Sequence, residues 1–413
     1  MRRIKVARNN AIIAALDIGT QSVTTLIAQK EENGLFSVIG KGVSENKGLI
    51  AGDVVDVQAT ASAIRDSVAE AENISSKRVK KVFVGVSGEG IRSINSHGVI
   101  QVRGQEVAKT DVIRVIDNAK DLTMLPDDSE IISVEIGKYS VDGKAGIVNP
   151  IGMACRKLEV DVLIITMPKT MCRNLYKAVE DAGFFVSGVV VNAIASSWAV
   201  LEEDEKNLGV AIVDIGDGVS DIAIYHDGDP VYVAVMPMGG KSVTDDISKV
   251  MKIPPSEAEK IKCKYGNSRP EYVSDTEVFD TVMIGTNAPT TKKVKQLATV
   301  ITPRIEEILI DVKKKLRESR KESLIQSDIV LTGGTAKLKN IQCVAEDALE
   351  QTVRIGMPKI DDADRGFNDV LSSPTFATAV GIIRHFSGRR QLEIAKKNGW
   401  LAKIADIFRN FFE

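Results

Sequence analysis

The sequence predicts an α/β fold in which two similar lobes face a shared cleft. Apolar strand-like runs rich in β-branched residues alternate with amphipathic helical patterns along the 413 residues. One unit also occurs twice, at 15–34 and 212–228: a buried strand ends in Asp-Ile-Gly, a short polar loop follows, and a second strand runs to a glycine turn. Two copies of one unit, with their aspartates at Asp17 and Asp214, indicate two related halves.

Composition excludes several classes of protein. At 44% hydrophobic and 27% charged, the chain can bury large cores. The net charge of −2 does not favour a nucleic-acid partner, and we expect none. The four cysteines and three histidines are scattered, which predicts neither a disulfide framework nor a zinc site.

The individual elements follow from periodicity. We expect strands at 11–18, 22–29, 81–87, 161–167, 209–215, 220–227, 229–237 and 328–334, and helices at 57–73, 169–183, 254–266 and 298–319. Residues 182–201 carry no charge and are long enough to cross a bilayer. Because this segment contains glycine, serine and asparagine, we expect a buried strand followed by the start of a buried helix.

The two repeated turns have the chemistry of phosphate-binding loops. Glycines allow close backbone approach to a ligand, and successive backbone N–H groups in such a turn bind anions. Carboxylates beside phosphates suit Mg²⁺, so Asp17 and Asp214 are the candidate metal ligands. The alternative is two ordinary hairpins whose aspartates cap turns. The first turn offers Gly19, Thr20, Gln21 and Ser22, and the second offers Gly216, Gly218 and Ser220.

Two further segments have residues that suit a nucleoside. Gly333 and Gly334 follow a predicted strand and precede an apparent helix, where a flat group or a phosphate can approach closely. Glu259 and Lys262 lie three apart on one helix face and could bracket the hydroxyls of a sugar. A simple surface ion pair is the alternative for those two residues.

The last 14 residues, WLAKIADIFRNFFE, hold four of the 19 aromatic side chains. Written as a helix, they place one apolar face opposite a polar one, and 387–413 carries six basic and three acidic residues. This pattern suits a helix lying in the interface of an anionic membrane. Docking on the chain's own body, or pairing as a dimer helix, are the alternatives. The apolar face comprises Trp400, Leu401, Ile404, Ile407, Phe408, Phe411 and Phe412.

Taken together, the ordered motifs resemble those of the actin-like ATPase superfamily, and within it the FtsA family of bacterial cell division. The resemblance covers nearly the whole chain. It rests on LDIGTQSV, IVDIGDGVSDIAIY, MGGKSVTDDI, EAEKIK and IVLTGGTAKL, with VSGEGIRSINSHG, GIVNPIG, ITPRIEEIL, SPTFATAVGI and the amphipathic end as narrower matches.

The resemblance implies an actin-like two-lobed fold with a nucleotide cleft between the lobes, an FtsA-type inserted subdomain and a C-terminal amphipathic helix. The implied parts are a first-lobe core (1–85 and 164–204), the insert (86–163), a second-lobe core (205–244 and 326–386), its outer subdomain (245–325), a linker (387–398) and the tail helix (399–413).

The function that the resemblance implies is that of an adapter at the division site. The tail would bind the inner face of the cytoplasmic membrane peripherally, and the outer subdomain would bind the C-terminal peptide of the filament protein FtsZ. Subunits with bound ATP and Mg²⁺ would assemble head to tail, and the insert would contact other division proteins. A pilus-assembly relative and a sugar or acetate kinase are the alternatives.

Family positions carry over one by one onto this sequence. Arg304 matches a position implicated in binding the FtsZ peptide. The nucleotide positions are Asp17, Gly19, Thr20, Gln21 and Ser22; Asp214, Gly216, Gly218, Val219 and Ser220; Gly239 and Gly240; Glu259 and Lys262; and Gly333, Gly334 and Thr335.

Some positions depart from the family pattern. Many relatives have lysine at the place of Ser22, and the second loop usually reads Gly-Gly-Gly-Thr where this chain has Asp217 and Val219. Active relatives place Glu or Gln in the segment corresponding to VVNAIASS, where this chain has Asn192. Because phosphoryl transfer to water depends on positioning that water, we expect at most weak ATPase activity.

Overall fold

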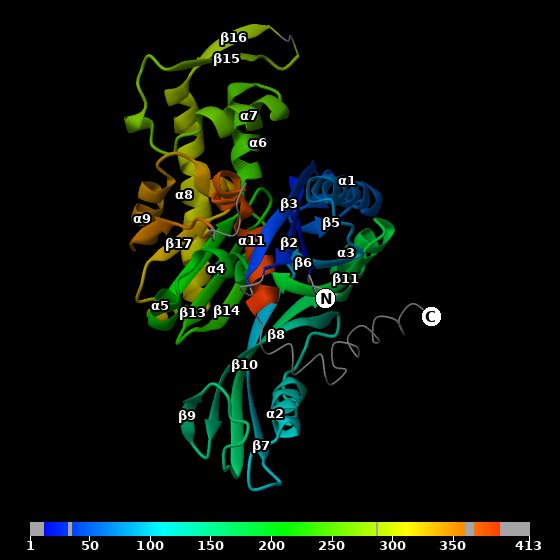
Figure 1. Cartoon of the computed structure of the whole chain (residues 1–413). Coiled ribbons are helices and arrows are strands. Elements are labelled where there is room, and N and C mark those ends of the chain that lie inside the picture. The colour runs from blue at the N-terminus through cyan, green and yellow to red at the C-terminus, as the bar shows by residue number, and fades with distance from the viewer. Residues whose placement is uncertain (1–11, 32–34, 286–287, 360–366, 389–413) are drawn as a thin grey trace, which may run out of the picture.

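The computed structural model describes residues 12–31, 35–285, 288–359 and 367–388. Within them the chain forms two lobes and an inserted subdomain that extends away from both (Figure 1). The tail helix predicted for 399–413 lies outside the described residues, as does most of the linker predicted for 387–398.

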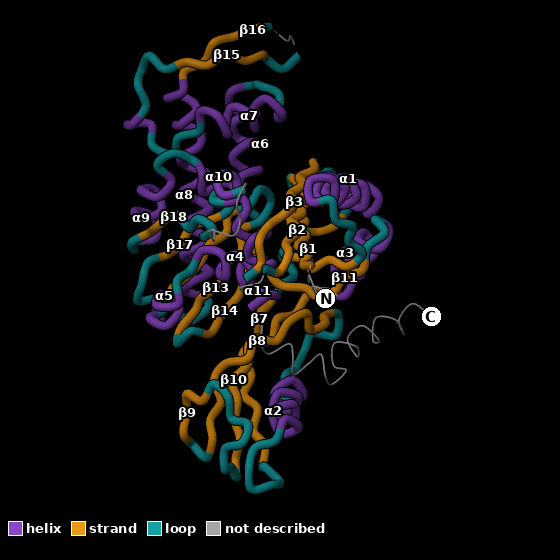
Figure 2. Tube along the Cα trace, viewed as in Figure 1, coloured by secondary structure: helices purple, strands orange, loops and turns teal. Residues whose placement is uncertain are grey.

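The first lobe is built on a five-stranded sheet in the order β11-β6-β1-β2-β3. Helices α1 and α3 pack on each other, as do α4 and α11, and α1 and α11 contact the sheet (Figure 2). Its elements are β1 (Ile12–Ile18), β2 (Ser22–Lys30), β3 (Phe36–Glu45), β4 (Leu49–Ile50), β5 (Asp53–Val54), α1 (Val57–Ser75), β6 (Lys81–Val86), α3 (Lys169–Asp181), β11 (Phe185–Val191), α4 (Asn192–Val200) and α11 (Ala377–Gly388).

The second lobe combines part of a nine-stranded sheet with a helical outer region capped by the hairpin β15–β16 (Figure 1). Its strands are β12 (Val210–Ile215), β13 (Ser220–His226), β14 (Asp229–Met236), β15 (Val278–Val282), β16 (Pro289–Lys293), β17 (Ile329–Thr332) and β18 (Val353–Ile355). Its helices are α5 (Glu203–Leu208), α6 (Gly240–Met251), α7 (Pro255–Tyr265), α8 (Val294–Glu318), α9 (Ile341–Leu349) and α10 (Asn368–Leu371), with 3-10 turns at Pro270–Tyr272, Glu322–Leu324, Gly334–Lys337 and Pro374–Phe376.

The insert continues the sheet of the second lobe. It comprises β7 (Arg92–Gln101), α2 (Lys109–Asp121), β8 (Ser129–Val141), β9 (Lys144–Ile147) and β10 (Lys157–Pro168), and the full strand order is β18-β17-β12-β13-β14-β7-β10-β8-β9. Strand β7 meets β14 through the pair Arg92 and Ala234. The Ser93 hydroxyl strengthens this junction, because it donates to the Val233 carbonyl at 2.8 Å and accepts from the Val233 N–H at 2.9 Å.

The internal repeat is visible in the strand pairing. In the first lobe β1 pairs antiparallel with β2 and parallel with β6, and Asp17 lies beside Gly85. In the second lobe β12 pairs antiparallel with β13 and parallel with β17, and Asp214 lies beside Thr332. The two aspartates therefore occupy equivalent positions at the ends of equivalent strands.

The eight strands and four helices predicted from periodicity are all present, with shifts at their ends. The uncharged segment 182–201 folds as β11 followed by the buried helix α4. Among the described residues, no helix combines the length and apolarity needed to cross a membrane. The two lobes also share apolar packing, because the core of the first lobe includes buried residues of β12 and β13.

Candidate functional site

The segments predicted to bind nucleotide converge between the two lobes. A Cβ added to Gly218 would come within 2.5 Å of the Thr20 hydroxyl oxygen, so the β1–β2 and β12–β13 turns touch each other. The loop after β17 joins them, because the Thr335 hydroxyl donates to the Gly216 carbonyl at 2.8 Å. The N-terminal end of α6 joins them too, since the Gly240 N–H donates to the same carbonyl at 2.9 Å.

Helix α7 closes this group across the lobes. The Gln21 amide of the first lobe donates to a carboxylate oxygen of Glu259 at 3.1 Å. The other Glu259 oxygen lies 2.7 Å from the Lys262 ammonium, which also donates to the Gly240 carbonyl at 2.9 Å. Burial acts to raise the pKa of Glu259, but Lys262 and the hydrogen bonds from Thr244 and Cys263 together lower the pKa on balance. The predicted pair is therefore an ion pair built into the cleft.

Two glycines are required by this geometry. Gly333 has a φ of +88°, and a side chain there would strike the Oδ1 atom of Asp214. A Cβ on Gly239 would lie 2.7 Å from the Gly216 carbonyl oxygen, so only glycine lets α6 begin against the second turn. The first turn of α6 therefore lies directly beside that turn and is bonded to it, because the Gly240 and Lys241 N–H groups donate to the Gly216 and Asp217 carbonyls.

The negative charge of Asp214 affects the ionisation of Asp17, the other repeated aspartate. Burial, with the charge of Asp214, raises the pKa of Asp17 to about 7. Burial also raises the pKa of Asp214, but hydrogen bonds from Ser196 and Thr378 act against it. Among the described residues, none donates a hydrogen bond to the Asp17 side chain. A cation placed between the two carboxylates would relieve this repulsion.

The remaining predicted residues hold the turns and the loop after β17 in their conformations. Gly19 and Gly216 donate their N–H groups to the carbonyls of Ser22 and Val219, and this closes the two turns. The Val219 side chain is buried in the apolar core of the first lobe. The Ser220 hydroxyl donates to the Met238 carbonyl at 2.7 Å, and Gly334 begins the 3-10 turn after β17.

The unusual Asp217 lies among charges of both signs. Burial is the main cause that raises its pKa, and Lys262 and Lys241 act in the opposite direction. The Asp217 carbonyl accepts the Lys241 N–H at 2.8 Å, which ties this residue to the first turn of α6. The net effect is a raised pKa of the Asp217 carboxyl, so this turn disfavours the extra negative charge that the sequence brings to it.

The fit to a bound Mg²⁺ and nucleotide can be judged from unsatisfied atoms. The Thr20 hydroxyl oxygen is buried and, among the described residues, has no hydrogen-bond partner. Within the same residues, no group of three or more His, Cys, Asp and Glu side chains is arranged as a metal site. Two carboxylates suffice for Mg²⁺, which keeps several waters and takes phosphate oxygens as ligands. The residues present therefore fit Mg²⁺ carried by a nucleotide better than a free metal.

Helix α4 carries no acidic or amide residue except Asn192, which begins it. The Asn192 Oδ1 atom is buried without a hydrogen-bond partner among the described residues. A Cβ added to Gly85 would lie 2.8 Å from that oxygen, and Gly85 pairs with Asp17. The amide therefore lies close to the predicted metal ligand, although it cannot accept a proton as a carboxylate can.

Arg304 lies on α8, on the outer part of the second lobe. Its guanidinium donates to the Asp246 carboxylate on α6 at 2.6 Å and also pairs with Glu307. The side chain is 27% exposed, so it links two helices and still presents a polar edge to solvent.

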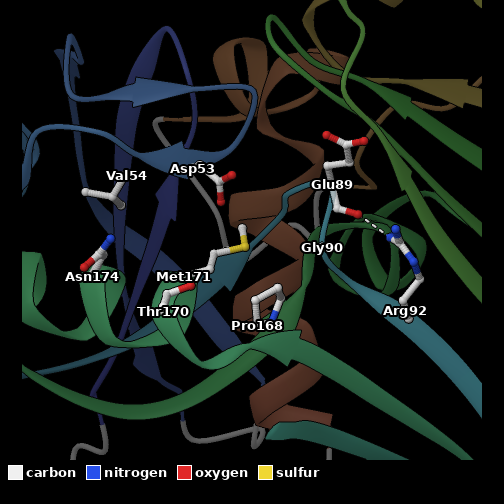
Figure 3. Close-up of a pocket in the computed structure, with 9 residues that line it drawn as sticks. All are labelled: Asp53, Val54, Glu89, Gly90, Arg92, Pro168, Thr170, Met171 and Asn174. Carbon is white, nitrogen blue, oxygen red and sulfur yellow. Dashed lines mark hydrogen bonds between the residues drawn. The ribbon is translucent and has the colours of Figure 1, made fainter. Parts of the chain in front are cut away.

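A separate cavity of about 460 Å³ lies where the first lobe meets the insert, outside the predicted nucleotide site (Figure 3). Asp53 and Met171 point toward its middle, and the Arg92 guanidinium is held by the Glu89 carbonyl. Burial, with the charge of Glu89, raises the pKa of Asp53. The lining residues are Asp53, Val54, Glu89, Gly90, Arg92, Pro168, Thr170, Met171 and Asn174.

Sequence reasoning missed this cavity and the partners of Asp214. Ser196 and Thr378 are 182 residues apart and look like ordinary residues of buried helices. It also missed Asp221, which lies opposite Asp214 on β13 and is 2% exposed. Burial, with the charges of Asp214 and Asp17, raises the pKa of Asp221 well above its usual range. The one available signal was an acidic residue directly after Ser220 in a strand otherwise apolar.

Comparison with known proteins identifies the family. A family model described as cell division protein FtsA matches residues 211–381, and one described as the SHS2 domain inserted in FtsA matches 88–166. The chain is 34% identical to cell division protein FtsA of Pseudomonas aeruginosa over 92% of this chain and 90% of that protein. It is 31% identical to that of Escherichia coli over 98% and 99%.

Solved structures agree on the fold. The PilM-PilN type IV pilus biogenesis complex matches with a TM-score of 0.64 and 18% identity, over 92% of this chain and 98% of the other. MreB 5 of Spiroplasma citri bound to AMPPNP matches with a TM-score of 0.54 and 15% identity, over 94% and 98%. The expected actin-like architecture with its inserted subdomain is therefore confirmed, and the chain belongs to the FtsA family of bacterial cell-division proteins.

Proposed function

We propose that this chain is an ATP-binding, self-assembling membrane adapter that tethers FtsZ filaments to the inner face of the cytoplasmic membrane and helps recruit later division proteins. The observation that carries the proposal is the convergence of the predicted loops between the two lobes, in a chain of the FtsA family. The fold neighbour MreB 5 is bound to AMPPNP, and this favours a nucleotide in the corresponding cleft.

In this proposal ATP enters with Mg²⁺. The phosphates would meet N–H groups of the two turns other than those of Gly19 and Gly216, which are already bonded within the turns, and the Thr20 hydroxyl would gain a partner. Asp17 and Asp214 hold the metal through its waters or directly. The sugar meets Glu259 and Lys262, and the base meets the loop at Gly333.

In this proposal ATP acts mainly by binding, which favours assembly, and its hydrolysis contributes little. Helix α4 provides Asn192 where active relatives place the Glu or Gln that orients the attacking water, and the Asn side chain is one methylene shorter than Gln. Turnover is therefore slow or absent. Steady hydrolysis by the purified protein at several per second would contradict this.

The tail supplies the membrane contact. A single short amphipathic helix binds reversibly, because it must be ordered as it inserts. Head-to-tail assembly in the presence of ATP aligns many tails, which raises the avidity of the polymer for the membrane without any new contact. Adapter and polymer thus belong to one mechanism.

The decisive experiment is co-pelleting with liposomes that contain anionic lipid, with and without Mg-ATP, for the full chain and a version ending at Arg390. We expect the full chain to pellet, more strongly with Mg-ATP, and the truncated chain to remain in solution. If both stay in solution, the tail is not an anchor and the membrane-adapter proposal fails. Neutral liposomes separate charge attraction from insertion.

The contact with FtsZ is proposed for the outer subdomain, around Arg304. Its partly exposed guanidinium could pair with a carboxylate of the bound peptide once the Asp246 contact is shared. Arg304→Ala should weaken binding of the FtsZ C-terminal peptide, measured by fluorescence anisotropy, and Arg317→Ala on the same helix is the control. Equal loss in both variants would contradict a specific role for Arg304.

The cavity beside the insert is the proposed contact for later division proteins. Its two carboxylates repel each other, so a basic side chain of a partner segment between them would be stabilised by both. Asp53→Asn combined with Glu89→Gln should weaken the binding of basic peptides from such partners and leave nucleotide binding unchanged. Unchanged peptide binding would exclude the cavity.

A further inference from the structure

The two aspartates of the cleft are held very differently. The Oδ2 atom of Asp214 accepts hydrogen bonds from the hydroxyls of Ser196 and Thr378, the latter at 3.0 Å. Both hydroxyl residues are buried, at 0% and 6% exposure. Asp17, in the equivalent position of the first lobe, receives no such bond among the described residues. The repeat therefore has one fixed carboxylate and one free one.

The two hydroxyls are held in place by the crossing of α4 and α11. A Cβ on Gly381 would overlap the Ala195 carbonyl oxygen, so the two helices touch backbone to backbone. This contact brings the hydroxyl oxygens of Ser196 and Thr378 to 3.0 Å from each other. With their positions set by two packed helices, they offer a rigid pair of donors to one carboxylate oxygen.

The remaining oxygen of Asp214 is also restricted. Its Oδ1 atom fills the space that a side chain at Gly333 would occupy, beside the loop that follows β17. Ser196 and Thr378 belong to the first lobe, whereas Asp214 ends β12 of the second. The hydrogen bonds therefore fix the carboxylate and join the two lobes.

We infer that Ser196 and Thr378 are positioning residues that orient Asp214 for a metal ion bound with the nucleotide. Residues that hydrogen-bond a metal-binding carboxylate set its orientation, and their loss typically costs about 10- to 100-fold in metal affinity. The inference rests on the proposed Mg-nucleotide site and extends it to two residues outside the predicted nucleotide positions.

The test compares the affinity for mant-ATP with Mg²⁺ and with EDTA, by fluorescence titration of the full chain. In Thr378→Val and Ser196→Ala the enhancement by Mg²⁺ should fall by about tenfold or more, while affinity in EDTA stays as in the wild type. Thr378→Ser keeps the hydroxyl and should keep the enhancement. Ser197→Ala is the matched control, because Ser197 is equally buried but bonds Tyr225 and not Asp214.

Each outcome decides one of the two claims. If Thr378→Val keeps the full Mg²⁺ enhancement, or if it loses affinity equally with and without Mg²⁺, the positioning role is wrong. If wild type binds mant-ATP without any Mg²⁺ enhancement, or does not bind it, the proposed site itself fails and this inference falls with it. Thermal melts of every variant separate unfolding from loss of metal binding.

Discussion

Asp17→Asn should make the nucleotide-free protein more stable while it removes Mg²⁺-dependent nucleotide binding. The pKa of Asp17 rises from 3.8 to about 7, because burial and Asp214 disfavour its charge. The raised pKa costs nothing below the unfolded-state pKa of 3.8, where the group is protonated in both states. The cost grows as pH rises from there to the folded-state pKa and is constant above it, so Asp17 destabilises the empty protein most at neutral and alkaline pH.

The magnitude follows from the two pKa values. Taking Asn as a neutral stand-in for the protonated acid, linkage gives a gain in unfolding free energy of about 1 kcal/mol at pH 4.5, about 3 at pH 6 and about 4 above pH 7.5. These are upper bounds, since Asp17 is partly exposed and solvent screens some of the repulsion. The gain should therefore grow with pH and level off above 7.

The assay is a set of thermal melts of the empty protein at pH 6 and pH 8, in EDTA, beside mant-ATP titrations with Mg²⁺. Asp66→Asn, which removes an exposed carboxylate on α1, is the control for the change in net charge. We expect Asp17→Asn to melt several degrees above wild type at pH 8, by a smaller margin at pH 6, and to show no Mg²⁺ enhancement. A variant that melts below wild type at pH 8 would refute the account of a repelled carboxylate.

Three other variants test separate parts of the molecule. Gln21→Ala removes the hydrogen bond to Glu259 between the two lobes and should lower the free energy of unfolding by less than about 1 kcal/mol. It should also speed nucleotide release in stopped-flow measurements, and an unchanged release rate would rule out a role for this bond in holding the lobes together. Gly381→Ala forces a methyl into the backbone of α4 and should cost about 3 kcal/mol or more in denaturant titrations, whereas a neutral result would mean the helices can part. Trp400→Glu with Phe408→Glu should abolish co-pelleting with anionic liposomes, and a variant that still pellets would show that another surface holds the membrane.

Much of the fold could be predicted from the sequence because it repeats. Strand periodicity placed all eight proposed strands, and the second Asp-Ile-Gly indicated a second lobe with its aspartate in the equivalent register. Glycines were informative where the backbone leaves no alternative, as at Gly333 with its φ of +88°. Local rules worked because each of these features is decided within a few residues of the chain.

The site's supporting contacts could not be predicted in the same way. The bond between Thr378 and Asp214 joins positions 164 residues apart, and threonine in a helix carries no sign of its partner. The sheet is continuous through the pair Arg92 and Ala234, which depends on how the insert packs against the second lobe. The periodicity of the sequence gives no information about that packing. The cavity at Asp53 exists only because three separate segments meet there.

Asp17 and Asp214 have equivalent backbone positions but different hydrogen-bond partners. Both aspartates end a strand at the same register of a repeated unit, so the backbone treats them alike. Two hydroxyls from the first lobe reach only Asp214, and they make its charged form easier to hold in a buried place. Asp17 is left without donors within the described part of the chain, burial and Asp214 raise its pKa to about 7, and a cation arriving beside it would stabilise its charged form. When the site is empty at neutral pH, one carboxylate is fixed by hydrogen bonds and the other has none from the described residues, and their charges repel each other. A metal that enters with its nucleotide would reduce this repulsion and so stabilise both lobes.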